Sequence, residues 1–160
     1  MKLAIFPDPI LREQMPDFDF DNPIADPKEL EKTMVDFMLD NNAIGLAANQ
    51  VGIKTRVFVM GHRDSPELSK AFFNPQVISA TPKILDLEEG CLSFPNVFVK
   101  IKRPSSIVGR WQDSQGQWQQ GEFVGYDCKC FLHELDHLEG IVFKDRVSNL
   151  KWTLANKRKS

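Results

Sequence analysis

The stretch His133-Glu134-Leu135-Asp136-His137 places two imidazoles four residues apart, with a carboxylate beside the first. Residues i and i+4 lie on one face of an α-helix, so His133 and His137 can bind one metal ion. Glu134 then lies where a water bound to that ion would be. The stretch therefore predicts a helix that carries the chemistry of a metallohydrolase. A surface helix with two solvated histidines is the alternative.

The residues around this stretch, 126–139, contain neither Gly nor Pro and show helical spacing. The apolar stripe at positions i, i+4 and i+7 consists of Phe131, Leu135 and Leu138. The histidines lie on a different stripe together with Cys130 and Tyr126. Asp127 is a suitable N-cap, and Gly140 stands where the helix is expected to stop. We therefore expect one buried apolar face and one face that carries the site.

Two histidines do not complete a catalytic metal site, which usually has three protein ligands and a water. A metzincin pattern would place the third histidine where Phe143 stands. A thermolysin-type site would take a glutamate from a later helix, but no Glu follows Glu139. Both downstream solutions fail, and the third ligand is expected upstream.

The strongest upstream donors are His62 and Cys91. His62 lies in a polar run with turn residues, where a solvated loop histidine is the favoured interpretation. Cys91 follows a strand predicted over residues 83–87, and Gly90 before it lets the backbone approach a ligand closely. A buried, inert thiol stays open as the alternative for Cys91 on the residue alone.

Three stretches together resemble the signature motifs of the peptide deformylase family, in the family's order and at about its spacing. They are Ala43-Ile44-Gly45-Leu46-Ala47-Ala48-Asn49-Gln50, Glu89-Gly90-Cys91-Leu92-Ser93 and His133-Glu134-Leu135-Asp136-His137-Leu138-Glu139-Gly140. The opening Phe6-Pro7-Asp8-Pro9-Ile10-Leu11-Arg12 is also similar to the family's N-terminus, so the resemblance extends to about Val147. Three ordered motifs are far more specific than any one of them.

The resemblance implies that Cys91, His133 and His137 hold one divalent cation and leave a position open for water. Metal-bound hydroxide would attack the formyl carbonyl, with Glu134 as general base and then as general acid. The resemblance favours Fe(II) as the metal. Zn(II), Ni(II) and Co(II) also suit thiolate and imidazole donors, and affinity order does not decide among them.

The family pattern also implies how the substrate is held. The donors to the negative oxygen formed in the attack are the side-chain amide of Gln50 and the backbone N–H of Leu92. The implied substrate is an N-formylmethionyl nascent peptide, paired with backbone edges as an added strand. The expected substrate-binding residues are Ile44, Gly45, Glu89, Gly90, Arg103, Tyr126 and Cys130.

Several features leave alternatives open. Arg103 is expected to pair with a carboxylate at the substrate end or with Asp136. Ala43, Lys129 and Leu132 depart from the family pattern and put the shape of the substrate pocket in question. A metallopeptidase that cuts internal peptide bonds is one alternative function. A peptide-binding relative with altered catalysis is the other.

Composition agrees with this interpretation. With 160 residues and 18.3 kDa, the chain suits a single catalytic domain over residues 1–160. A net charge of −2 and a pI of about 5.9 give no footprint for a specific nucleic-acid site. No apolar run suggests a signal peptide or a membrane span, and three cysteines, an odd number, favour reduced thiols. We therefore expect a cytoplasmic protein.

The pattern along the chain predicts an α+β fold, with antiparallel strands packed around the central helix that carries the His-Glu-x-x-His motif. An amphipathic helix is expected from Pro27 to about Asp40–Asn42. Strands are expected around residues 56–60, 72–80, 83–87, 97–101, 106–112 and 117–124. Residues 113–116 between the last two strands are expected to form a hairpin turn.

The C-terminal tail, residues 148–159, is expected to form at most a short helix. Its basic end, Lys157, Arg158 and Lys159, offers at most a weak contact to the ribosome. A frayed, solvated end is the favoured interpretation.

Overall fold

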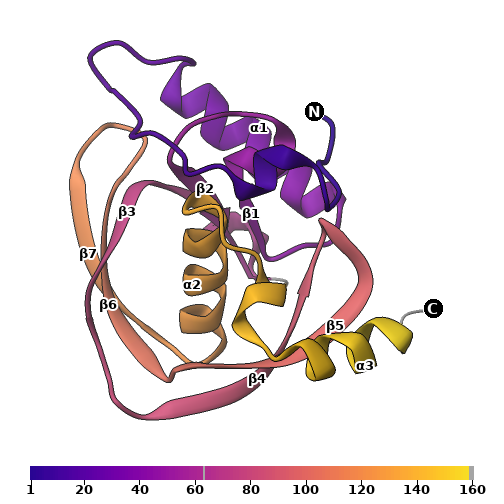
Figure 1. The fold of residues 1–160 in the computed structure, drawn as a ribbon. Coiled ribbons are helices and arrows are strands. Elements are labelled where there is room, and N and C mark those ends of the chain that lie inside the picture. Colours follow the sequence, from indigo (N-terminus) through magenta and orange to yellow (C-terminus); the bar gives the residue numbers. More distant parts are fainter. Residues whose placement is uncertain (63, 159–160) are drawn as a thin grey trace.

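The computed structural model describes residues 1–62 and 64–158. Helix α2 (Tyr126–Leu138) lies in the middle of the molecule, and antiparallel strands surround it (Figure 1). One sheet has the strand order β1-β2-β3-β6-β7, and β4 pairs with β5 in a second sheet. The strands are β1 (Gly45–Ala47), β2 (Val57–Met60), β3 (Lys70–Ala80), β4 (Ile84–Cys91), β5 (Phe94–Pro104), β6 (Ser106–Gln112) and β7 (Trp118–Val124). The predicted α+β fold around the motif helix is confirmed.

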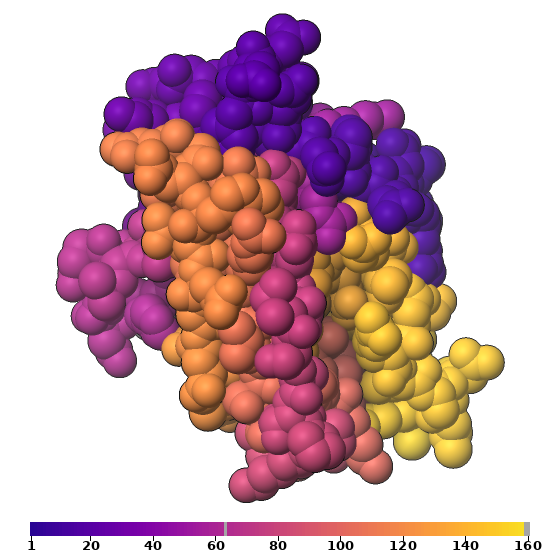
Figure 2. Space-filling view, turned by 90° about the vertical axis from the view of Figure 1, so that its left-hand side faces the viewer, coloured from indigo at the N-terminus to yellow at the C-terminus, as the bar shows by residue number. Residues whose placement is uncertain are grey.

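Further helices complete the fold, and one of them, the 3-10 helix over residues 48–51, is buried and packs against α2. They are α1 (Pro27–Asp40), α3 (Asn149–Lys157) and the 3-10 helices η1 (Pro9–Arg12), η2 (Ala48–Val51), η3 (Pro66–Leu68) and η4 (Phe143–Arg146). Figure 2 shows the outer surface of the larger sheet, where β6 and β7 lie beside β3 and below the N-terminal segment. In the part of the chain that the structure describes, no helix is long and apolar enough to cross a membrane.

Helix α1 has the predicted bounds because its sequence supplies both an N-cap and a buried stripe. The carboxylate of Asp26 accepts hydrogen bonds from the N–H groups of the second and third helical residues, and Pro27 occupies the first position. The buried residues Leu30, Met34 and Met38 pack toward β1, β2 and β3. This packing fixes one side of the larger sheet.

Helix α2 is buried on more than one side, whereas an amphipathic helix buries a single face. Phe131 and Leu138 are fully buried, and the ring of Phe131 packs edge-on against Phe58 of β2 at 5.1 Å. Leu135 is only half-buried, whereas the opposite side of the helix, which carries Asp136, is buried too. The predicted division into one apolar and one polar face was therefore too simple, because strands contact the helix on several sides.

The two ends of α2 depend on glycine. The predicted N-cap Asp127 is wrong: the helix begins after Gly125, whose φ is +62°, and Asp127 lies in its first turn near His62, 3.7 Å away. The predicted stop at Gly140 is confirmed, with a φ of +75°. A Cβ at that position would lie 2.6 Å from the carbonyl oxygen of Arg12, so both conformation and space require glycine.

The β4–β5 hairpin is longer than predicted, because its exposed residues do not interrupt the pairing. It runs from the Ile84↔Pro104 pair to Gly90↔Phe98, and an irregularity then places Cys91 opposite Phe94. The turn at residues 113–116 is confirmed. The three-residue strand β1, which pairs with β2, was not predicted, because a strand this short gives no periodic pattern.

The C-terminal tail forms a short helix, α3 (Asn149–Lys157), as expected. The Ser148 hydroxyl accepts a hydrogen bond from the N–H of Lys151 and caps α3. Trp152 packs edge-on against Phe94 at 5.4 Å, and Ala155 is buried. Lys157 and Arg158 are exposed, and Lys159 lies outside the described residues.

Candidate metal centre

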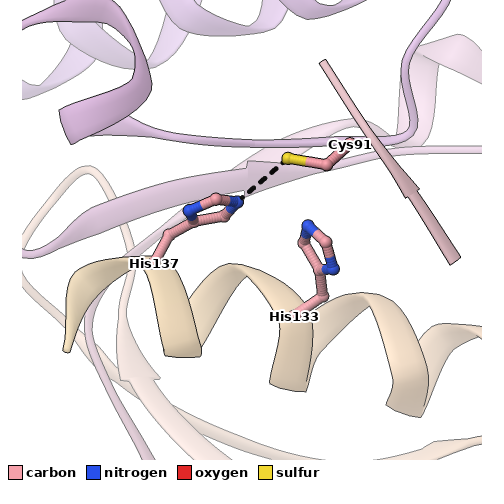
Figure 3. A group of neighbouring side chains, drawn as sticks. All are labelled: Cys91, His133 and His137. Atoms are coloured by element: carbon pink, nitrogen blue, oxygen red, sulfur yellow. Dashed lines mark hydrogen bonds between the residues drawn. The ribbon is translucent and has the colours of Figure 1, made fainter. Parts of the chain in front are cut away.

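Three candidate ligands from distant parts of the sequence converge at the end of β4 and on the C-terminal half of α2 (Figure 3). The ligand atoms of Cys91, His133 and His137 all lie within 4.8 Å of one another. The Sγ of Cys91 lies 3.3 Å from Nε2 of His137. One sulfur and two imidazole nitrogens are a donor set suited to a divalent transition metal, and they leave room for a further ligand. The residues therefore fit the cation that the sequence implies.

The hairpin end sets the position of Cys91. Across the strands, Gly90 pairs with Phe98, whose ring lies so close that a Cβ at Gly90 would be 2.6 Å from it. Absence of a side chain at Gly90 thus lets the ring cover the strand immediately before the ligand. The register then shifts, and the Cys91 thiol faces α2.

Contacts with Glu89 fix the ring of His133. Its Nδ1 lies 2.7 Å from Oε1 of Glu89, which leaves Nε2 available to a metal. Glu89 is buried, and burial opposes its charge, but hydrogen bonds from His133 and Arg103 hold its pKa at about 2. By contrast, Nδ1 of His137 is buried without a hydrogen-bond partner among the described residues. The protein therefore constrains His133 more than His137.

Glu134 is poised to move a proton. It is buried, its Oε1 accepts no hydrogen bond from any described residue, and it lines a cavity beside His133. Burial raises its pKa to about 7. A Cβ at Gly45 would lie 2.7 Å from Oε2 of Glu134, so the glycine lets β1 approach the carboxylate. Near neutral pH such a group can both accept and return a proton.

The amide of Gln50 is held in one orientation. Its Oε1 accepts a hydrogen bond from the N–H of Ala47 at 2.9 Å, so its Nε2 points the other way. This Nε2 donates to Oγ of Ser93 at 3.0 Å and lies 3.5 Å from Sγ of Cys91. Ser93 was not singled out from the sequence, although its place in the Glu89–Ser93 motif was a signal.

The centre opens into a cavity of about 620 Å³. The expected site residues that line it are Ile44, Gly45, Gln50, Glu89, Gly90, Cys91, Leu92, Cys130, His133 and Glu134. Ala43 and Lys129, which depart from the family pattern, also line it, whereas Leu132 does not. The lining residues that the sequence did not single out are Asn42, Glu88, Pro95, Asn96 and Phe98. Lys129 donates from Nζ to the carbonyl oxygen of Glu88 at 3.0 Å and so joins α2 to β4 at the cavity. Phe98 could have been found from the hairpin register, because it lies opposite Gly90.

Two expected substrate-binding residues do not reach this cavity. Tyr126 is 62% exposed and lies under the ammonium of Lys129, because the first turn of α2 extends beyond the cavity. Arg103 is buried and forms ion pairs with Glu89 and Asp136, the second of the two partners considered for it. Its guanidinium therefore acts on the protein's own carboxylates.

Comparisons with known proteins agree on one family. The family model described as polypeptide deformylase matches residues 1–152. The chain is 38% identical over 158 residues to the peptide deformylase of Thermotoga neapolitana, covering 98% of this chain and 93% of the relative.

Solved structures lead to the same family. The crystal structure of the Thermotoga maritima peptide deformylase has a TM-score of 0.84 at 35% identity and covers 92% of this chain and 97% of that one. The Plasmodium falciparum peptide deformylase has a TM-score of 0.90 at 31% identity and covers 98% of this chain and 92% of that one.

Proposed function

Because the chain belongs to the polypeptide deformylase family, we propose that it hydrolyses the N-formyl group from the initiator methionine of newly made polypeptides and releases formate. The observation that carries the proposal is the convergence of Cys91, His133 and His137 beside the buried carboxylate of Glu134 in one cavity. We also propose that residues 1–160 act as one catalytic domain in the cytoplasm.

Cys91, His133 and His137 would hold one divalent cation, which we propose is Fe(II) by family resemblance. When bound, such a cation supplies Lewis-acid chemistry, which lowers the pKa of a water and polarises a carbonyl. Zn(II), Ni(II) and Co(II) suit the same donors. Glu89 keeps His133 ready for a cation, because it binds the ring nitrogen that faces away from the site.

Glu134 would carry the proton. With a pKa of about 7, its carboxylate accepts a proton from the attacking water and returns it to the amine that leaves. The approach of β1 at Gly45 narrows the space around this carboxylate. This proximity favours proton transfer within the cavity over exchange with solvent.

Gln50 and Leu92 would stabilise the oxygen that becomes negative during the attack. The orientation of the Gln50 amide turns its Nε2 toward Cys91, where a substrate carbonyl would lie. Its hydrogen bond with the Ala47 N–H fixes this direction before substrate binds, as effective electrostatic stabilisation requires. The backbone N–H of Leu92, the residue after the thiolate, is the proposed second donor.

The cavity would hold the methionine side chain. Ile44, Cys130 and Phe98 give it apolar walls, and Lys129 brings a cation to its lining. Gly45 and Gly90 would leave the backbone of β1 and β4 accessible to an extended peptide, which is the geometry of β-strand addition. Tyr126 and Arg103 are not part of this proposed substrate site, because they lie outside the cavity.

Formate release from formyl-methionyl peptides tests the proposal. We expect the anaerobically purified, Fe(II)- or Ni(II)-loaded protein to release formate from a formyl-Met tripeptide and to leave its acetylated counterpart intact. Cleavage of an unformylated peptide at an internal amide would favour the metallopeptidase. Binding of the formyl peptide without formate would favour the relative with altered catalysis, and either result would overturn the proposal.

A further inference from the structure

A series of alternating charges connects the protein surface to the candidate ligand His133. At the surface, Arg146 of η4 donates from Nη2 to Oδ1 of Asp136 at 2.7 Å and from Nε to Oδ2 at 3.0 Å. Arg103 donates from Nη1 to the same Oδ2 at 3.0 Å. Arg103 also binds both carboxylate oxygens of Glu89, whose Oε1 faces Nδ1 of His133.

The contacts between the arginines and the carboxylates restrict the orientation of the side chains as well as the distance between them. Arg146 contacts both oxygens of Asp136, and Arg103 contacts both oxygens of Glu89, so each carboxylate plane is fixed against a planar guanidinium. Asp136, Arg103, Glu89 and His133 are each no more than 8% exposed. Water cannot readily replace a lost partner at such positions, so a change at one end is transmitted to the next group.

We infer that Arg146 is a positioning residue for the metal ligand His133, acting through Asp136, Arg103 and Glu89. The inference deepens the proposed function and rests on its metal site. Arg146 itself has a side chain that is 43% exposed and does not line the cavity. Its removal leaves Asp136 held by a single hydrogen bond from Arg103, so the carboxylate that orients the Arg103 guanidinium toward Glu89 is no longer fixed. The ring of His133 loses its fixed direction as a result.

The alternative role for Arg146 is to attach η4 to α2 without any effect on the metal. The adjacent residue offers a matched control, because Asp145 of η4 forms an ion pair with Arg12. The Arg12 side chain is 44% exposed, almost the same as Arg146, and its ion-pair partner Asp145 is not a member of the charge series. Replacing Arg12 with Leu therefore removes an arginine ion pair from the same 3-10 helix while leaving Asp136 untouched.

The rate at which the protein loses Co(II) to a chelator distinguishes a role of Arg146 in positioning His133 from a role in attaching η4 to α2. Co(II) is loaded into four proteins: wild type, Arg146→Leu, Arg146→Lys and Arg12→Leu. The visible absorption of the bound ion is then followed after addition of excess EDTA. We expect Arg146→Leu to lose cobalt about tenfold faster and to show a shifted absorption band, since outer contacts of metal ligands have effects of this size. Arg146→Lys keeps the charge but not the two-point contact, so it should fall between wild type and Arg146→Leu.

Thermal unfolding of the metal-free proteins completes the test. Arg146→Leu should lower the midpoint at least as much as Arg12→Leu, because Asp136 is more buried than Asp145, but only Arg146→Leu should accelerate cobalt loss. Equal cobalt loss from wild type and Arg146→Leu would overturn the inference, and so would an equal acceleration by Arg12→Leu. If the wild-type protein bound no Co(II), the proposed metal site itself would be contradicted. Absence of deformylase activity in protein that retains Co(II) would count against the proposed reaction and leave the role of Arg146 standing.

Discussion

Replacing Glu134 with Gln is expected to lower formate release by a factor on the order of 10²–10⁴, the usual contribution of a general acid–base group. The amide has nearly the shape of the carboxylate but cannot accept the proton of the attacking water. Because Glu134 is not one of the three converging ligands, the variant should keep its metal. Initial rates and metal content are to be measured on the same sample.

Glu139→Gln is the matched control for this experiment. Glu139 ends the same helix, and its carboxylate pairs with Arg56 outside the cavity. This control should retain the wild-type rate. A Glu134→Gln variant with full activity and full metal content would contradict the role of Glu134 as proton carrier.

Replacing Arg103 with Met should lower the free energy of unfolding by about 3–5 kcal/mol, as expected when one partner of a buried ion pair is removed. Methionine fills much of the same space but leaves Glu89 buried with only His133 as a partner. Asp136 keeps Arg146 and is affected less. Denaturant unfolding of the metal-free protein measures the loss.

Two further variants make the Arg103 experiment specific. Lys32→Met removes a cation from the exposed i, i+4 pair with Asp36 and should leave the unfolding midpoint unchanged within error. Adding Glu89→Gln to Arg103→Met should recover part of the lost stability, since the unpaired buried charge is gone. If Arg103→Met lowered the free energy of unfolding as little as Lys32→Met, the Arg103 guanidinium would not be needed to stabilise the buried carboxylates.

The sequence predicted those parts of the molecule whose pattern is local. Helix α1 carries its own cap and stripe, and the spacing of His133 and His137 determines that both rings lie on one face of α2. The strands were predicted in place, but several were predicted too short, because exposed residues such as Glu88 and Lys102 break the apolar pattern without ending the pairing. Pairing depends on the partner strand, which local pattern does not include.

The features that sequence reasoning missed depend on contacts between distant segments. By helical periodicity, Tyr126 lies on the same stripe as the histidines. The cavity is bounded by β1 and by the β4–β5 hairpin, and it ends before it reaches Tyr126. Ser93 anchors Gln50 only because the two segments that carry them pack together. The contact of Arg146 with Asp136 requires the chain to turn back at Gly140, and nothing in the residues alone places η4 beside α2.

Formate release measured together with bound metal per chain tests whether Cys91, His133 and His137 hold the ion that the reaction requires. The comparison is between the anaerobically purified wild type and Cys91→Ser, which exchanges the thiolate for a poorer donor to soft transition metals. We expect one ion per wild-type chain, formate release in proportion to the ion bound, and a large loss of both in Cys91→Ser. Full formate release by metal-free protein, or wild-type metal content and rate in Cys91→Ser, would contradict it.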